Sequence, residues 1–301
     1  MPEAEDADRG RLVATAFRLL GTTADAEDAV QEAFVRWFRM ERAERDAVRN
    51  VDAWFTTVVG RICLDVLGSA RARREQYVGE WLPEPRPGDG VVATGSARAS
   101  DPAEQASVGD QVTTALMVVL EALTPAERVA FVLHDLFGLS FVEIAEVVGR
   151  SPQACRKLAS DARRDLRERK VRDAEPAEHE RVVTAFLVAA GSGRLDDLVA
   201  VLDPSVTLVT DGGGRAGMAR RPVRGAERVA RFLLGIVQKA ERQGREVLPS
   251  IELVDGRAAI VLREDGDDPF VITLHVVREV VQDVWIQANP AKLRAWTATG
   301  G

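Results

Sequence analysis

A segment rich in glycine and proline interrupts the first third of this 301-residue chain. Residues 79–102, GEWLPEPRPGDGVVATGSARASDP, hold four Gly and four Pro among 24 residues. Proline removes a backbone donor and glycine favours irregular backbone, so a long helix or strand cannot form there. A second, shorter break, VRDAEPAE, lies at 171–178. The sequence therefore predicts three modules, at about 1–78, 103–172 and 178–296, with 79–102 as the first linker.

The composition indicates an ordinary globular protein, with 46% hydrophobic and 29% charged residues. No apolar run approaches the roughly 18 residues of a membrane helix, and the start MPEAEDADRG lacks the order of a signal peptide. We therefore expect a cytoplasmic protein without membrane insertion. Cys63 and Cys155 lie in helical patterns with no His or Cys at ligand spacing, which predicts no disulfide, no metal site and no cofactor.

The basic stretch at 149–170, GRSPQACRKLASDARRDLRERK, contains eight Arg/Lys against three Asp/Glu in a chain of net charge -7. On a helix with 100° per residue its polar and basic residues share one face. These are Arg156, Ser160, Arg163, Arg167 and Lys170. The apolar residues gather on the neighbouring sector: Cys155, Leu158, Ala159, Ala162 and Leu166. The helix is thus expected to dock by a narrow apolar stripe with its basic flank outward.

The residues before this helix predict a tight turn. Ser151 and Pro152 supply an N-cap and an N1 proline, and Gly149 ends the preceding segment. That segment, FVEIAEVV at 141–148, has apolar residues at helical spacing. A helix, a three-residue turn and a helix form the helix-turn-helix motif, whose second helix enters the major groove of DNA. The alternative is a solvated basic surface helix, which the turn and cap make less favourable.

The first module is predicted to be helical throughout. The stretch 22–38 begins with a Thr/Asp cap and repeats apolar residues at i, i+3 and i+4, with acidic and polar residues outward. The next helix, from Asp52, carries Trp54 near its start and continues into the basic run SARARR at 69–74. An acidic helix is therefore followed by an aromatic and basic one.

These helices resemble those of the extracytoplasmic-function sigma factors of bacterial RNA polymerase. DAEDAVQEAFVRW (25–37) is similar to the polymerase-binding helix of that family, and AWFTTVVGRICLD (53–65) to the helix that engages the minus-10 element. Residues 123–152 are similar to the module that reads the minus-35 element. The resemblance implies core RNA polymerase and promoter DNA as partners and no catalytic residue.

The resemblance and the chemistry together suggest contact residues. For the polymerase we expect Asp25, Asp28, Gln31 and Glu32, with a merely solvated face as the alternative. Unstacked bases are captured by aromatic platforms and cations. For the minus-10 element the candidates are Trp54, Arg61, Arg71, Arg73 and Arg74, with Trp54 as a core residue being at least as well supported. Arg61 stands where many members of the family carry Asn. For the minus-35 element they are Ser151, Gln153, Arg156, Lys157 and Ser160, with Arg163 and Arg164 for phosphates.

The third module is predicted to be an α+β cone. Helical patterns begin at Glu178 and Gly225, and strand patterns follow, one pair joined at Asp255 and Gly256. Helices before a curved antiparallel sheet enclose an apolar pocket, which leaves room for a small-molecule ligand. The module resembles the SnoaL-like C-terminal domain of one sigma factor subgroup, through WLPEP at 81–85, DGGG at 211–214 and NPAKL at 289–293. The fold class is thus two all-α modules followed by an α+β domain.

Fold alone does not separate regulation from enzymology for such a cone. The available acid/base groups are Asp211, His275 and Asp283, and the sequence indicates no defined pair among them. We interpret His275 as structural and assign the module to control of the sigma function. The expected regulatory contacts are Trp81, Asp211, Gly212, Gly213, Gly214, Asn289, Pro290, Lys292 and Leu293.

Two other readings compete with a promoter-specificity subunit. A stand-alone helix-turn-helix regulator with a ligand-sensing cone would leave the acidic helix and the Trp54 helix without a task. A SnoaL-like enzyme with helical attachments is disfavoured by the missing acid/base pair. An exposed Trp in a Gly/Pro linker also lacks a local purpose, so we expect the linker to pack against the cone and the tail to close that contact.

Overall fold

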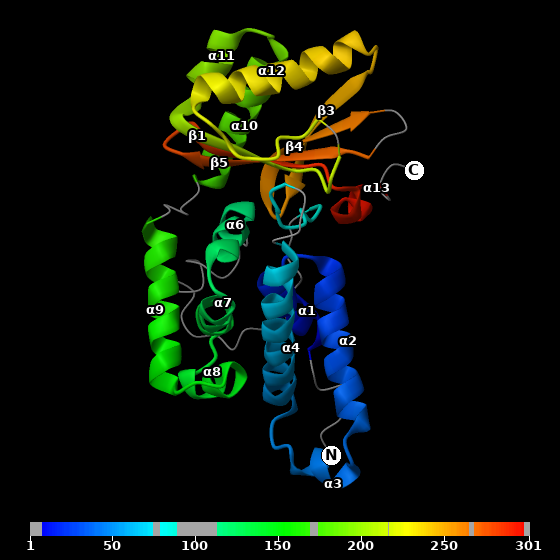
Figure 1. The fold of residues 1–301 in the computed structure, drawn as a ribbon, viewed down its shortest axis with the longest axis vertical. Coiled ribbons are helices and arrows are strands. Elements are labelled where there is room, and N and C mark those ends of the chain that lie inside the picture. The colour runs from blue at the N-terminus through cyan, green and yellow to red at the C-terminus, as the bar shows by residue number, and fades with distance from the viewer. Residues whose placement is uncertain are drawn as a thin grey trace. The chain divides into compact units, whose positions relative to one another are not determined.

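The fold was obtained as a computed structural model that describes residues 8–74, 79–88, 113–168, 174–215, 217–264 and 268–297 (Figure 1). The chain forms two compact units. The helical unit comprises Met1–Glu75, Val91–Val112 and Leu116–Val171, and the C-terminal unit comprises Gln76–Gly90, Thr113–Ala115 and Arg172–Gly301. Part of the first linker therefore belongs to the C-terminal unit and not to the helices that it follows.

The first half of the helical unit consists of α1 (Arg9–Leu20), α2 (Thr23–Arg39), α3 (Arg42–Ala47) and α4 (Val51–Arg74). Local signals set these boundaries. Asp8 caps α1 by accepting a hydrogen bond from the Arg11 amide at 3.0 Å, and Gly21 ends it with a positive φ of 81°. Thr22 then caps α2, as the sequence predicted.

The second half consists of α6 (Thr114–Ala122), α7 (Pro125–Phe131), the π-helical turn η2 (Val132–Leu136), α8 (Phe141–Val148) and α9 (Pro152–Glu168). Capping boxes at Thr124 with Glu127 and at Ser140 with Glu143 begin α7 and α8. Gly149 ends α8 with a φ of 69°. The predicted helix, three-residue turn and helix are therefore confirmed, including the residue that ends the first helix.

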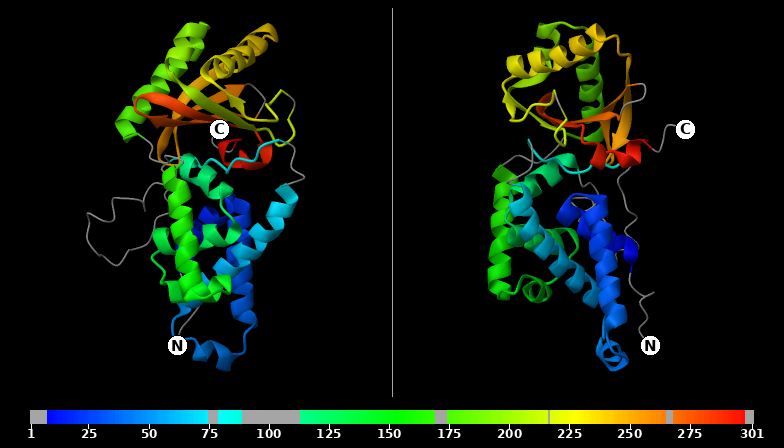
Figure 2. Two further views of the ribbon diagram at one scale, coloured as in Figure 1. Left: turned by 60° about the vertical axis from the view of Figure 1, so that its left-hand side comes forward. Right: turned by 45° about the vertical axis from the view of Figure 1, so that its right-hand side comes forward.

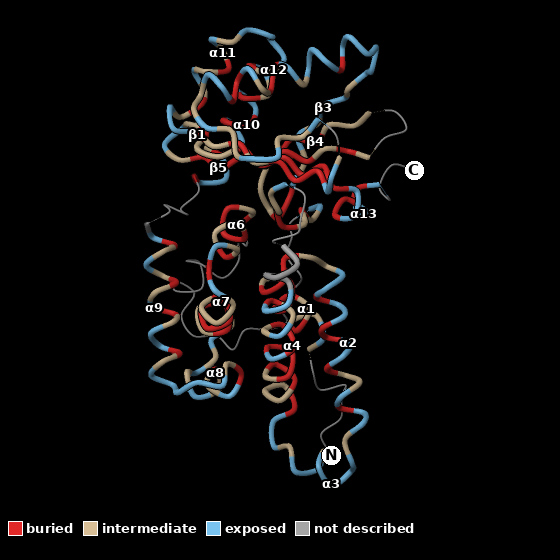
Figure 3. Tube along the Cα trace, viewed as in Figure 1, coloured by how far each residue is buried: buried red, intermediate tan, exposed pale blue. Residues whose placement is uncertain are grey.

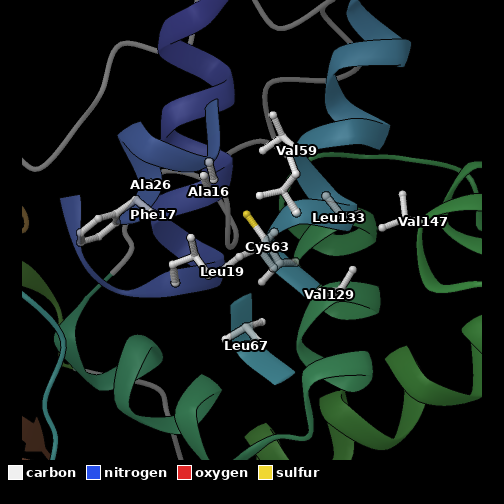
Figure 4. Packing of buried hydrophobic residues seen from close by; sticks show 14 of the residues in the cluster. Ala16, Phe17, Leu19, Ala26, Val59, Cys63, Leu67, Val129, Leu133 and Val147 are labelled. Carbon is white, nitrogen blue, oxygen red and sulfur yellow. The ribbon is translucent and has the colours of Figure 1, made fainter. Parts of the chain in front are cut away.

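One hydrophobic core joins the two halves of the helical unit (Figure 4). Cys63 of α4, Leu133 of η2 and Val147 of α8 all belong to it. A Cβ on Gly60 would lie 2.9 Å from the Val147 Cγ1 atom, so a larger residue on α4 would push α8 away. Burial of Cys63 raises the pKa of its thiol, in keeping with its expected role as a small core residue.

A buried arginine fastens α7 to α1. The Arg128 side chain is 2% exposed, donates to the Arg18 carbonyl at 3.2 Å and pairs with Glu121. That carbonyl lies in the last turn of α1, where free carbonyls and the helix dipole favour a cation. Burial lowers the pKa of Arg128 to about 9.

The C-terminal unit contains α10 (Pro176–Gly191), α11 (Leu195–Ala200), β1 (Leu202–Asp211), β2 (Val223–Arg224), α12 (Ala226–Arg242), β3 (Val247–Val254), β4 (Arg257–Glu264), β5 (Phe270–Val277), β6 (Val280–Gln287), η3 (Pro290–Lys292) and α13 (Arg294–Thr297). Its six strands form one sheet in the order β2-β1-β6-β5-β4-β3. The turn between β3 and β4 is made by Asp255 and Gly256, both with positive φ, at the predicted position.

The prediction of an antiparallel sheet was wrong for one pair of strands. β1 and β6 pair in parallel, with Leu208 opposite Val284, so the sheet is mixed. Hairpin signals report only strands that are neighbours in the chain, and some 70 residues separate β1 from β6. The α+β class itself is confirmed.

Different segments of the chain pack on the two faces of this sheet (Figures 2 and 3). On one face, Leu208 and Ile272 pack with Phe186 of α10 and Leu233 of α12 in one core cluster. On the other face, Val271 forms a smaller cluster with residues of the tail. Since α10 and α12 cover only one face, the second face is left to segments outside the cone, and this is where the linker lies.

Candidate nucleic-acid interface and linker clasp

The acidic residues of α2 form an exposed face, as predicted. Asp25, Asp28, Gln31 and Glu32 are all exposed. The opposite side of the helix is buried at Ala26, Ala29, Val30, Ala33 and Trp37. Glu32 forms an ion pair with Arg36 at 3.0 Å. The surface offers carboxylates to a basic partner, and the contact with polymerase remains a prediction for each of these residues.

On α4 the structure favours a packing role for Trp54. Its half-buried ring meets Trp37 and Phe55 edge-on, each at 5.0 Å between ring centroids. Arg61 is exposed and donates to the Glu146 carbonyl near the end of α8, at 2.8 and 3.1 Å. Arg71, Arg73 and Arg74 end α4, and their side chains lie outside the described residues.

The exposed flank of α9 brings together most of the predicted minus-35 residues. Ser151, Gln153, Arg156, Lys157, Ser160 and Arg164 are exposed. Ser151 accepts a hydrogen bond from the Ala154 amide at 3.2 Å, which is the predicted cap. The Arg156 guanidinium lies 5.2 Å from the Phe141 ring centroid, a contact that orients it beside the helix N-terminus.

Arg163 differs from Arg164 because its ion-pair partner lies on another element, whereas Arg164 pairs with Asp161 of α9 itself. Arg163 is half-buried and donates to Asp135 at 2.8 Å, with His134 at 3.1 Å. Its predicted phosphate contact would have to compete with this ion pair. Periodicity within α9 could not show the pair, because Asp135 lies 28 positions earlier.

The first linker binds the outer face of the cone through a set of contacts that we call the linker clasp, formed by Trp81–Gly88 with the C-terminal unit. Asp211 is fully buried and accepts hydrogen bonds from the Leu82 amide at 3.0 Å and the Lys292 ammonium at 2.7 Å. Lys292 also donates to the Leu82 carbonyl at 2.6 Å and lies 3.9 Å from the Trp81 ring centroid. Three of the predicted residues therefore meet at one place: Trp81 of the linker, Asp211 before the glycine run and Lys292 of the tail. Gly214, also predicted, has open space where a side chain would stand.

Further along the linker, its backbone is bound by residues that the sequence did not single out. Gln287 donates to the Pro83 carbonyl at 3.1 Å, and the Trp296 indole donates to the Pro85 carbonyl at 2.8 Å. Gly88 donates to the Leu253 carbonyl at 2.8 Å, so the linker pairs briefly with the free edge of β3. Two signals in the sequence could have indicated that the linker packs on the C-terminal unit: Trp296 in the tail and Arg86 in the Pro-rich linker.

The linker also carries a buried ion pair. Arg86 donates to Asp255 at 3.0 Å, and its carbonyl accepts from the Asp255 amide at 2.9 Å. Burial raises the pKa of the Asp255 carboxyl to about 6, although Arg86 opposes the shift.

The glycine run permits the close approach of a side chain. A Cβ on Gly213 would lie 2.5 Å from the Asn289 Cγ atom, and Gly213 has a φ of 57°. Gly212 is also crowded, since a Cβ there would lie 2.7 Å from the Met218 side chain, although its φ is not positive. Asn289 in turn caps η3, which begins at the exposed Pro290 and is followed by the buried Leu293.

The expectation that the cone has no acid/base pair was wrong. His275 Nδ1 lies 3.0 Å from the Asp283 carboxylate, and the imidazole stacks against Trp285. The two residues face each other across β5 and β6, a register that the sequence did not show. Among the described residues, no hydrogen bond joins the second ring nitrogen of His275 to a nucleophile. A hollow beneath the linker, lined by Leu82 and Trp285, measures about 10 Å³, room for one water molecule.

Comparison with known proteins agrees with this geometry. The family model for sigma-70 region 2 matches residues 6–74, and the model for sigma-70 region 4 matches residues 113–166. The ECF RNA polymerase sigma factor SigJ of Mycobacterium tuberculosis is 46% identical over 234 residues, which cover 77% of this chain and 71% of SigJ. The probable sigma factor SigI of the same organism is 41% identical over 231 residues, covering 76% and 74%.

The crystal structure of M. tuberculosis SigJ superposes with a TM-score of 0.71 at 38% identity, covering 95% of this chain and 96% of that one. No helix in the described part of the chain is both long and apolar enough to cross a membrane. A stand-alone regulator and an enzyme would each leave the match to sigma region 2 unexplained. The chain therefore belongs to the family of extracytoplasmic-function (ECF) RNA polymerase sigma factors.

Proposed function

We propose that the C-terminal unit of this sigma factor controls transcription initiation by holding the linker between sigma regions 2 and 4. The observation that carries the proposal is the linker clasp, in which buried side chains bind the linker backbone. Asp211 and Lys292 between them bind both polar groups of the Leu82 backbone, and Trp296 binds a third group. A linker that served only as a passive tether would not need such specific hydrogen-bond partners.

The clasp shortens the reach of the chain between the two sigma regions. Between Arg74 at the end of α4 and Thr114 at the start of α6, 39 residues could extend to roughly 130 Å. When the clasp is closed, only residues 75–80 separate α4 from the first residue of the clasp, Trp81, a reach of about 20 Å. Opening the clasp would remove this restraint, so that region 2 could move much farther from region 4 once the core that joins them also opens, as recognition of two separate promoter elements requires.

Within the helical unit we assign contacts by exposure and charge. The acidic face of α2 would bind core RNA polymerase, since its carboxylates are exposed and its other side is buried. The exposed flank of α9 would read the minus-35 element, with Arg156 near the helix N-terminus at a base edge and Arg164 farther along at a phosphate. We also propose that a small-molecule effector, if the cone binds one, acts by displacing the linker, since the closed clasp leaves room for about one water molecule.

In vitro transcription tests the control. We would compare the full chain, a chain ending at Ala288, and a full chain with Lys292→Met and Trp296→Phe, using the promoter of its own gene. Both altered chains lose clasp donors, and the double variant retains the buried apolar volume of the tail. We expect both to change transcript yield at least threefold and in the same direction, with polymerase binding in a pull-down retained.

The matched control is Arg181→Met, which removes one positive charge from an exposed position on α10, outside the clasp. The control measures how much transcript yield changes when a positive charge is lost outside the clasp. If the altered chains fold, bind polymerase and transcribe like the unaltered protein, the clasp does not control initiation and the C-terminal unit is a passenger.

A further inference from the structure

The C-terminal unit carries a cluster of exposed basic residues to which no role has been assigned so far. The cluster, which we call the arginine patch, consists of five exposed residues: Arg220, Arg221, Arg224, Arg228 and Lys239. Between positions 220 and 239 there are six basic residues and one acidic residue, in a chain whose net charge is -7. The patch is therefore positively charged, although the protein as a whole is negatively charged.

The fold places the loop after β1, which carries Arg220 and Arg221, next to α12, which carries Arg228 and Lys239. The loop after β1 is fixed by the Thr210 hydroxyl, which donates to the Ala219 carbonyl at 2.9 Å. It runs beside α12, since a Cβ on Gly217 would lie 3.5 Å from the Lys239 ammonium (Figure 1). Arg228 and Lys239 are 11 residues apart on α12, which is three helical turns, so both point to the same side.

None of the ion pairs among the described residues neutralises this patch. The neighbouring Arg231 pairs with Glu227 at 2.5 Å, and Arg245 pairs with Glu264 at 2.5 Å. Other arginines on the same unit behave likewise, as Arg194 does with Asp197. Like charges held together on a folded surface repel one another. Binding of an anionic partner at this patch would relieve that repulsion.

We propose that the arginine patch binds the phosphate backbone of duplex DNA next to the site that α9 reads. Only seven residues separate the end of α9 at Glu168 from the start of α10 at Pro176, a reach of about 25 Å. DNA held by α9 is thus presented to the C-terminal unit at a high effective concentration, so weak phosphate contacts suffice. The proposal rests on the DNA contact assigned to α9, and it adds a second DNA-binding surface to the same chain.

The test is a salt titration with the full chain and a fluorescein-labelled 40-bp duplex, without polymerase. The test variant carries Arg221→Gln, Arg224→Gln and Arg228→Gln. The control variant changes charge equally at three exposed arginines that have ion-pair partners, Arg181, Arg194 and Arg245. Each phosphate contact contributes about 0.9 to the slope of log K against log salt, so the test variant should lose about 2.7 units.

We expect the control variant to keep its slope within half a unit, and the test variant to bind the duplex at least tenfold more weakly at low salt. Equal losses in both variants would show a general charge effect and overturn the proposal, as would unchanged binding in the test variant. The proposal is likewise wrong if the test variant loses binding to polyglutamate or to phosphatidylserine vesicles but not to DNA. Because the assay contains no polymerase and leaves the clasp intact, its failure is distinct from a failure of the proposed control.

Discussion

Replacing Lys292 with Met removes one charge from the centre of the linker clasp. The Asp211 carboxylate would then remain fully buried without the ammonium group, while the Leu82 and Gly213 amides still donate to it. Removing one partner of a buried ion pair costs about 3–5 kcal/mol, because the remaining charge stays desolvated. The lost hydrogen bond to Leu82 and the lost contact with Trp81 are part of that figure and do not add to it.

Because the closed clasp is destabilised by this free energy, the linker should open more often. The Leu82 amide is held by Asp211, so its hydrogen exchange reports release of the linker from the cone. At about 1.4 kcal/mol per decade, exchange at Leu82 should accelerate by roughly 100- to 4,000-fold. Exchange at Ile272, in the core between sheet and helices, should stay slow if the cone remains folded.

Two further variants decide whether the reasoning is correct. Lys239→Met makes the same chemical change at an exposed lysine outside the clasp and should leave Leu82 exchange unaltered. Lys292→Met combined with Asp211→Leu removes both charges and should recover most of the lost protection, since a buried pair can often be replaced by apolar residues at little cost. Unchanged exchange at Leu82 in the single variant would refute the buried ion pair as the source of closure.

Three other predictions concern the remaining surfaces. Charge reversal at Asp28 and Glu32 should weaken core-polymerase binding in a pull-down while circular dichroism stays the same, and undiminished binding would contradict the assigned face. Arg156→Ala should cost about 1–3 kcal/mol at one promoter position in a library titration, whereas Arg164→Ala should weaken all sequences alike and reduce the salt slope by about one unit; equal uniform losses would remove the distinction. Burial raises the pKa of Asp255 from an ordinary value of 3.8 to about 6, so ionisation destabilises the folded state. The stability of the protein relative to its Asp255→Asn variant should therefore fall by about 2.4 kcal/mol as pH rises from 4 to 7. Denaturant unfolding of both chains at several pH values measures this difference, and parallel pH profiles would show that Asp255 does not titrate in that range.

Much of the helical unit follows from local sequence. Ser151, Pro152 and Gly149 predicted the turn of the helix-turn-helix, because caps and left-handed glycines act within a few residues. The outward position of Asp28 followed from helical periodicity in the same way. These features needed no knowledge of distant neighbours, and the structure confirms them.

The partners of these residues were decided by the tertiary structure. Trp54 could have been a base-stacking platform or a core residue from its sequence alone, and only its contacts with Trp37 and Phe55 favour packing. Arg163 belongs to a basic face by periodicity, yet its ion pair with Asp135 crosses from α9 to η2. A helical pattern states which side of a helix is polar, but it carries no information about the element that side will meet.

The linker clasp shows the same division most clearly. The sequence by itself marked an exposed Trp, a glycine run and a polar tail as features without a local explanation. It could not show that Asp211 would meet Lys292 across 81 positions, or Leu82 across 129. Those contacts depend on β1 pairing in parallel with β6, which places the end of each strand at one edge of the outer face. Strand and helix propensities arise from neighbours in the chain, whereas this pairing is chosen by burial of the whole core, so only the folded protein determines it.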